Sequence, residues 1–363
     1  MGRNVITKPA KRLLTLVLPP KWRRKIRERL LPLQVSHLHG TERVHLSSHE
    51  AIVTCIVKNG EFYMESFIEH YTNMGFRHIF FLDNGSTDRT ISIAKRYENV
   101  SVCQSNLSIQ ANQSLYKRYM AEKCAVNGWC LDADIDEFFD YPGAEVMELQ
   151  RFLEYLNRNQ YTAVVTQLLD MFSDQPLSHL VMEQHENLKE VYQYYDISEV
   201  ERKDYRAADF VLQNAYLNQI SYTNTEVLFG GVRKTLYGSG WITNCLLTKH
   251  SLFRLGKGVE LFPHVHFVNK AKLADVSCLM LHYKLTSNAL VTALQNKDSF
   301  SAIGKGYNDF VDFLLRNPEH YIKQTTAAKY KNASVLMDSG FLFAGPEYRE
   351  YVASFTQRIT QAD

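Results

Sequence analysis

Short apolar segments alternate with amphipathic segments between residues 51 and 131, and this order constrains the fold more than any other feature. Residues 51–57 (AIVTCIV) are apolar and β-branched, which is typical of a buried strand. Further strands and helices follow in alternation. We expect strands at 78–82, 100–103 and 129–131, and helices around 64–71, 88–97 and 112–126. This β-α-β order predicts an α/β fold with a mostly parallel sheet and helices on both faces.

The rest of the chain gives weaker signals. We expect a helix at 145–159 and a strand at 162–169, then an irregular insertion or lid over the polar, Tyr-rich residues 170–225. Later strands are expected at 245–248, 264–268 and 278–283. A helical pattern follows residue 286, with an apolar stripe that favours core packing at Tyr307, Phe310, Phe313 and Leu314. This divides the chain into an N-terminal extension (1–48), an α/β domain (49–285) and a C-terminal helical extension (286–363).

Composition excludes several classes of protein. Hydrophobic residues make up 45% and charged residues 22% of the 363 residues, which excludes a disordered or collagen-like chain. No apolar run reaches the 18 or so residues of a membrane span. None of the six cysteines forms a C-x-x-C pair, so a zinc or redox motif is not expected, and a reduced, cytoplasmic protein is the simplest interpretation. The apolar stretch at 13–18 ends in two prolines and does not resemble a secretory signal.

Positive charge is concentrated at one end of the chain. Residues 1–29 carry ten Lys or Arg and one Glu, a net charge of +9, whereas the whole chain carries +2 and the remainder therefore −7. Apolar residues interleave with these charges up to residue 31. The pattern suits a peripheral segment on anionic lipid at the inner face of the cell membrane. A solvated or packed N-terminal extension is the alternative. Nucleic acid is not an expected partner, because the chain shows no recognisable nucleic-acid module.

An acidic cluster is the densest chemical signal. The segment LDADIDEFF at 131–139 places four carboxylates within six residues, directly after an apolar strand. Such carboxylates repel one another unless a cation shares them, and hard oxygen ligands suit Mg²⁺ or Mn²⁺. The alternative is an acidic surface turn, which the flanking apolar residues argue against.

The ends of the predicted strands direct attention to further polar residues. Ligands of parallel α/β sheets bind beyond the carboxyl ends of the strands. Lys58 and Asn59 follow the first strand, Asp83 and Asn84 follow the second, and the acidic cluster follows the fourth. Turn formation alone is the alternative for Asp83 and Asn84. Asp88 is expected to cap a helix.

A resemblance to a known family joins these motifs. KNGE at 58–61, DNGSTDRT at 83–90 and DIDEF at 134–138 resemble the family 2-type glycosyltransferases of the GT-A fold. The likeness is to a bacterial subgroup with K-N-E, D-N-x-S-T-D-x-T and D-x-D-E-F motifs. It extends to GGVR at 230–233, Lys249, His266 and LHYK at 281–284, so it covers about residues 50–320. Gly60 departs from the pattern, since the subgroup often has Glu there, although Glu61 follows.

The resemblance implies a Rossmann-like GT-A domain with a nucleotide-binding half (49–140) and an acceptor half (141–285). Such enzymes move a sugar from a nucleotide diphosphate sugar to an acceptor hydroxyl, with Mn²⁺ or Mg²⁺ at the D-x-D motif. Carried over, the metal ligands are Asp134, Asp136 and one histidine, His266 or His282, with His264 a weaker third. The donor contacts are Lys58, Asn59, Glu61, Asp83, Asn84, Asp134, Arg233 and Lys249. A salt bridge within the acidic body is the alternative for Arg233 and Lys249.

The resemblance leaves other points open. An inverting enzyme needs a carboxylate base near the acceptor hydroxyl, and the candidates are Asp170, Asp174 and Asp209. A glycan or lipid-linked acceptor, in cell-surface polysaccharide or lipopolysaccharide synthesis, is implied by analogy alone. The competing hypotheses are a phosphatase or phosphotransferase with an Asp-x-Asp nucleophile, and a non-catalytic sugar- or membrane-binding protein on the same fold.

Overall fold

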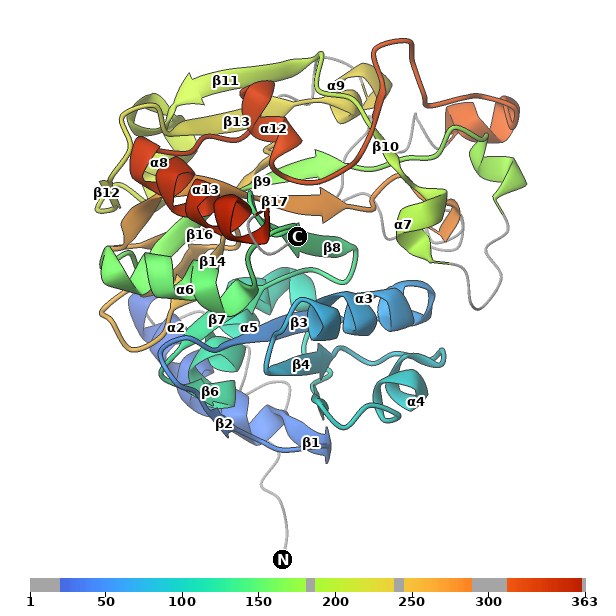
Figure 1. Ribbon diagram of the computed structural model, residues 1–363. Helices are drawn as coiled ribbons and strands as arrows, with labels where there is room; N and C mark the ends of the chain where they lie inside the picture. Colours follow the sequence, from blue (N-terminus) through green and yellow to red (C-terminus); the bar gives the residue numbers. More distant parts are fainter. Residues whose placement is uncertain (1–19, 181–186, 238–244, 289–311, 361–363) are drawn as a thin grey trace, which may run out of the picture.

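The computed structural model describes residues 20–180, 187–237, 245–288 and 312–360. Its centre is a mixed sheet with the strand order β1-β5-β4-β3-β7-β14-β9-β17-β12 (Figure 1). The parallel strands are β3 (Ala51–Val57), β4 (His78–Asp83), β5 (Val100–Gln104), β7 (Trp129–Asp132), β9 (Ala163–Asp170), β12 (Gln219–Ile220) and β17 (Lys272–His282). The antiparallel strands are β1 (Ser36–His39), β8 (Glu137–Asp140) and β14 (Thr248–Arg254). The predicted α/β fold with a mostly parallel sheet is confirmed.

Helices cover both faces of this sheet, because the central strands are apolar on both sides. In β3, Val53 and Cys55 belong to one core cluster, and Ile52 and Ile56 belong to the other. The first cluster includes residues of α3 (Glu61–Asn73), α4 (Thr90–Ala94) and α6 (Leu149–Arg158). The second includes residues of α5 (Ile109–Cys124) and α8 (Asp209–Asn214). Near-continuous apolar strands of this kind are what a sheet buried on both faces requires.

The N-terminal segment is attached to the body. Helix α2 (Pro20–Leu30) leads into η1 (Leu31–Gln34), where Leu31 is buried, and β1 then extends the sheet beside β5. Glu28 forms an ion pair with Arg118 of α5 at 2.5 Å. A short parallel pair, β2 (Val44–His45) and β6 (Ala125–Val126), follows. Residues 36–45 therefore share strands with the α/β domain. The apolar and basic residues of 1–19 lie outside the described residues.

Residues 170–237 contain several short elements, most of them within 170–225, where the sequence predicts an irregular insertion. They are η2 (Leu177–His179), α7 (Leu188–Val191), β10 (Tyr194–Tyr195), β11 (Val200–Asp204), η3 (Tyr205–Ala207), α8, β12, β13 (Glu226–Gly230) and α9 (Val232–Tyr237). Strands β11 and β13 pair over five residues as an antiparallel ribbon. The expectation of irregularity was wrong because each element is too short to produce a visible period.

The expected strand at 264–268 was also wrong. The chain turns between β15 (Glu260–His264) and β16 (Phe267–Asn269), which form an antiparallel hairpin. The apolar residues of this segment face the second core cluster from both sides of the turn, which produced a strand-like pattern. The expected strand at 245–248 begins only at Thr248.

The described C-terminal part returns to the main body. Strand β18 (Ala328–Lys329) pairs with β10, and α12 (Val335–Asp338) and α13 (Pro346–Thr360) follow. Helix α13 lies beside α6 (Figure 1), and the ring of Tyr348 packs against Phe152 and Tyr155. Of the expected stripe, Leu314 is buried and Phe313 is exposed, whereas Tyr307 and Phe310 lie outside the described residues. Among the described helices, none is long and apolar enough to cross a membrane.

Candidate functional site

Four polar residues end four parallel strands at the same edge of the sheet. Asp83 ends β4, Asp132 ends β7, Asp170 ends β9 and His282 ends β17. All four side chains are buried. Because β7, β9 and β17 point the same way, their carboxyl ends bring together residues that are 150 positions apart in the sequence. This is the edge at which ligands of parallel α/β sheets bind.

A group of donor atoms at this edge fits a divalent cation. One donor atom each from Asp136, Glu137 and His282 lies within 4.8 Å of the others. Asp136 Oδ2 lies 3.6 Å from His282 Nε2. The backbone holds these residues in place, since Tyr283 N donates to Asp136 O at 2.8 Å and β8 pairs His282 with Glu137. Two carboxylates and one imidazole suit Mn²⁺, whereas Mg²⁺ takes oxygen ligands almost alone.

Asp170 supports this group from behind. Its Oδ1 accepts a hydrogen bond from His282 Nδ1 at 2.6 Å, and its Oδ2 accepts one from Arg233 Nε at 2.6 Å. The side chain of Asp170 is 2% exposed, that of His282 7% and that of Arg233 10%. Burial by itself would raise the pKa of Asp170, but Arg233 and His282 hold it below its ordinary value. Asp170 is therefore a carboxylate whose two oxygens each have a partner.

Two buried lysines balance the rest of the acidic cluster. Lys117 of α5 lies 2.5 Å from Asp132 Oδ2 and 3.2 Å from Asp134 Oδ1. Lys249 of β14 lies 3.0 Å from Asp134 Oδ2 and also pairs with Glu137. Burial would lower the pKa of both lysines, but the carboxylates raise it above the ordinary value. For Asp134, burial would raise the pKa, but the two lysines outweigh burial and lower the pKa. Both oxygens of Asp134 thus have ammonium partners, unlike those of Asp136.

The polar residues after β3 and β4 bond mainly to one another. We call residues 58–61 and 83–90 the strand-end network. Asn59 Oδ1 accepts from Thr87 N at 2.8 Å, and Asn59 N donates to Ser86 Oγ at 2.8 Å. Asp88 accepts from Glu61 N at 3.1 Å and from Thr90 N at 3.0 Å, and Glu61 pairs with Arg89. The network joins the start of α3 to the start of α4, and Asp88 contributes at both helix starts.

Asp83 and Asn84 form the base of the same network. Asp83 is 0% exposed, and its carboxylate accepts from Gly85 N, Ser86 N and Gln104 Nε2 at 2.7–3.2 Å. Asn84 Nδ2 donates to the carbonyl oxygens of Ser105 and Leu107. These bonds shape the loop, which is the turn-forming role left open from the sequence. Lys58 is exposed beside them.

None of the remaining candidates belongs to the grouped donors. His266 follows His264 in the β15–β16 hairpin, on the side of the lysines, and burial together with Lys249 and Lys117 lowers its pKa well below its ordinary value. Asp174 is half-buried four residues after β9, and Asp209 is the exposed first residue of α8. Arg233 and Lys249 both form ion pairs within the site.

Two residues of the site were missed from the sequence. Glu137 was seen only as part of the acidic run, although it starts β8 and faces His282 across the pair with β17. No role was predicted for Lys117 from the sequence. It is buried on the same stripe of α5 as Met120, Ala121 and Cys124. A lysine at helical spacing with apolar residues signals a buried cation that needs an acidic partner.

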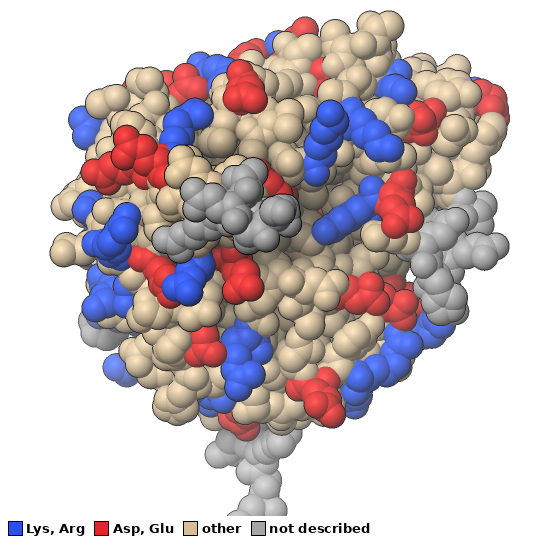
Figure 2. All heavy atoms as spheres, viewed as in Figure 1, with Lys and Arg blue, Asp and Glu red and all other residues tan. Residues whose placement is uncertain are grey.

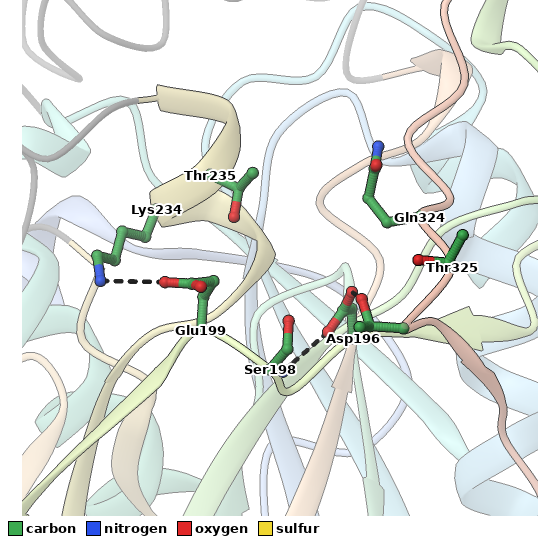
Figure 3. A pocket seen from close by; sticks show the side chains of 8 residues that line it. Asp196, Ser198, Glu199, Lys234, Thr235, Gln324 and Thr325 are labelled. Carbon is green, nitrogen blue, oxygen red and sulfur yellow. Dashed lines mark hydrogen bonds and ion pairs between the residues drawn. The ribbon is translucent and has the colours of Figure 1, made fainter.

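A polar hollow lies beside α9. It has a volume of about 460 Å³ and is lined by Asp196, Ser198, Glu199, Lys234, Thr235, Gln324, Thr325 and Thr326. Figure 3 shows side chains from α9, from the β10–β11 loop and from residues 324–325 around it, with Lys234 facing Glu199. Lys234, which lines the hollow, directly follows Arg233, which pairs with Asp170. Helix α9 therefore contributes to both the hollow and the candidate site. On the face seen in Figure 2, acidic and basic side chains are interspersed.

No family model and no curated protein sequence matches the chain. Among solved structures, it is similar to glucosyl-3-phosphoglycerate synthase from Mycobacterium tuberculosis, which was determined in complex with Mn²⁺, uridine diphosphate and glucosyl-3-phosphoglycerate. The two are 17% identical, with a TM-score of 0.21 over 33% of this chain and 44% of that one. The chain thus matches less than half the length of that protein, and a likeness of this size does not bear on function.

Proposed function

We propose that this protein transfers a sugar from a nucleotide diphosphate sugar to an acceptor hydroxyl, with the help of a divalent cation. The observation that carries the proposal is the grouping of Asp136, Glu137 and His282 within 4.8 Å, at the sheet edge where Lys249 and Arg233 are also buried. Ligands for a cation and fixed positive charges at one place suit a substrate that carries a diphosphate. The motif resemblance points to the same chemistry.

The two carboxylates and one imidazole of the grouped residues favour Mn²⁺ over Mg²⁺ as the cation. Asp136 and His282 would bind it, with Glu137 as a third ligand, and when bound it would stabilise the negative charge that develops on the departing diphosphate. Asp134 is a weaker ligand candidate here, because it is not one of the grouped donors and each of its oxygens pairs with a lysine. We propose instead that Asp134 orients Lys249 and Lys117 toward the donor.

The reaction needs one proton to leave. The acceptor oxygen forms a bond to the anomeric carbon, the bond from that carbon to the diphosphate oxygen breaks, and the hydroxyl proton passes to a carboxylate base if the reaction inverts. Asp170 is already bound by His282 and Arg233, and Asp209 is exposed on α8. We therefore propose Asp174 as the base to test first. The hollow beside α9, with its hydroxyl and carboxylate lining, is our candidate for the acceptor.

A donor screen tests this proposal. The protein would be stripped of metal with EDTA and incubated with a panel of UDP-, GDP-, dTDP- and CMP-linked sugars, with and without Mn²⁺. We expect slow Mn²⁺-dependent release of nucleotide from one donor, and faster release with the right acceptor. Absence of Mn²⁺-dependent release and of any nucleotide-induced rise in Tm across the panel would refute the proposal. Binding without release would favour the non-catalytic alternative.

The basic N-terminal segment has a separate place in the proposal. We propose a cytoplasmic enzyme that contacts the inner face of the membrane through residues 1–31, near a lipid-linked acceptor of cell-surface polysaccharide or lipopolysaccharide synthesis. Support comes from the net +9 of residues 1–29 and from the exposed side chain of Leu30. Co-sedimentation with anionic liposomes should be lost when residues 1–19 are deleted, and equal sedimentation of both proteins would contradict this part.

A further inference from the structure

Backbone hydrogen bonds between neighbouring strands hold one edge of the candidate cation site in place. Strands β9 and β17 run parallel, and their register places His282 opposite Asp170. Met171 N donates to His282 O at 2.9 Å, and Tyr283 N donates to Asp136 O at 2.8 Å. Backbone hydrogen bonds therefore connect the segment of His282 to the segment of Asp170 on one side and to that of Asp136 on the other.

The hydrogen bond between His282 and Asp170 fixes which ring nitrogen carries the proton. Arginine side chains stay charged in proteins, so the ion pair with Arg233 keeps Asp170 ionised. An ionised carboxylate can only accept hydrogen bonds. Nδ1 of His282, 2.6 Å from Asp170 Oδ1, must therefore be the donor. In a neutral imidazole this leaves the lone pair on Nε2, and Nε2 is the atom that faces Asp136 Oδ2 at 3.6 Å. That lone pair is what a metal ion needs.

We infer that Asp170 is a positioning residue: it holds His282 in the Nδ1–H tautomer, aims Nε2 at the cation site, and is itself held by Arg233. This role rests on the proposed function, since it assigns a purpose to the cation site within it. Each oxygen of Asp170 has one partner, so Asp170 does not serve as the base that accepts the acceptor's proton. Partners of this kind behind a metal-binding histidine typically change metal affinity by 10–100-fold.

The first measurement concerns the tautomer in the metal-free protein. Long-range ¹H–¹⁵N spectra at pH 8 report which nitrogen of each histidine is protonated, and the signals missing from His282→Gln identify His282. We expect Nδ1–H in the unmodified protein. In Asp170→Leu we expect a mixture or a switch to Nε2–H. Finding Nε2–H, or protons on both nitrogens, in the unmodified protein would overturn the inference.

The second measurement is Mn²⁺ affinity by EPR. Asp170→Leu should weaken Mn²⁺ binding about 10–100-fold. Because this change leaves the Arg233 guanidinium buried without its ion pair, Asp170→Leu/Arg233→Met is made as well, in which both charges are replaced by apolar groups of similar volume. We expect the same loss in the double variant. A folded double variant with the affinity and tautomer of the unmodified protein would overturn the inference.

A matched control separates this role from general stability. Asp275 is a buried carboxylate on the same strand as His282, and it accepts hydrogen bonds from Tyr155 at the other end of β17. Asp275→Asn should leave both the His282 tautomer and the Mn²⁺ affinity unchanged, and equal losses there would count against a specific role of Asp170. If Mn²⁺ binds and depends on Asp170 but no nucleotide sugar reacts, the proposed transfer fails while the inference stands. If the unmodified protein binds no Mn²⁺, the inference fails too.

Discussion

The strand-end network and the charged group around Asp136 occupy the same sheet edge but differ in what their polar side chains contact. In the strand-end network, Asn59, Glu61, Asp83 and Asp88 bond to nearby backbone and side chains of residues 58–61, 83–90 and 104. Around Asp136, side chains from α5, α9 and β14 reach the carboxylates, and most of the carboxylates there have buried cationic partners. Hydrogen bonds between two adjoining loops set the shape of those loops, whereas buried ion pairs set the chemistry of a site.

The two regions should also differ in energy. A side chain that caps an exposed helix start contributes about 1 kcal/mol. A buried charge that loses its partner costs several times more, because it remains without water or a counter-ion. The comparison therefore predicts large effects of substitution around Asp136 and small effects in the strand-end network.

The largest stability effect is expected at Lys117. Lys117→Met removes the cation beside Asp132 and Asp134, and should lower the free energy of unfolding by about 3–5 kcal/mol. Urea unfolding at pH 7.5 measures it. The double variant Lys117→Met/Asp132→Asn should recover most of the loss. A single variant within about 1 kcal/mol of the unmodified protein would mean that the buried ion pair is not formed in solution.

Acid should lower the stability of the folded protein in part through His250. His250 is buried next to Lys249, and burial lowers its pKa to about 4. Because the unfolded chain takes up a proton near pH 6.5 and the folded one does not, stability is unaffected above that pH. It falls as the pH drops toward 4, by about 1.4 kcal/mol per pH unit for this residue.

His250→Gln tests this source of acid sensitivity. The variant should lose about 2 kcal/mol less stability than the unmodified protein between pH 7 and pH 5, as measured by urea unfolding at the two values. Other buried histidines are present in both proteins, so the difference isolates His250. An equal loss in both would show that His250 becomes protonated in the folded state.

The smallest of these effects is expected in the strand-end network. Asp88→Ala removes hydrogen bonds to Glu61 N and Thr90 N, and should cost about 1 kcal/mol of stability. Mn²⁺ affinity should not change. Mn²⁺ binding is measured by EPR. A loss of Mn²⁺ binding in this variant would show that the strand-end network and the cation site are coupled, and would contradict the difference drawn between them.

The sequence predicted the fold well where its signals were local and strong. Residues 51–57 and 129–131 are continuous apolar runs bounded by turns, and both became strands of the central sheet. The hairpin at 260–269 was missed because both of its strands are short and only two residues separate them. The short elements between 170 and 237 were missed because two to six residues do not establish a period.

The sequence predicted single residues of the site but not how they pair. The carboxylates of 132–137 stand out in the sequence, a strand end marks Asp83, and the family resemblance marks His282. Strand register and helix packing decide that Asp170 pairs with Arg233 and that Lys117 pairs with Asp132. Neither register nor packing can be predicted from this sequence alone. Burial also decides roles, since Asp83 is fully buried within its own loop while Asp136 keeps part of its surface exposed.

Calorimetric titration of Mn²⁺ and nucleoside diphosphate into the unmodified protein, Asp136→Asn and Asp88→Asn tests the central claim most directly. The claim is that Asp136, with His282, holds a divalent cation for a nucleotide diphosphate donor. We expect Mn²⁺-dependent nucleotide binding in the unmodified protein and in Asp88→Asn. In Asp136→Asn we expect that dependence to be lost, with Mn²⁺ affinity reduced by more than about 100-fold, beyond the effect of an outer partner. A folded Asp136→Asn variant that retains Mn²⁺-dependent nucleotide binding would contradict the claim and move the cation to Asp132 or Asp134.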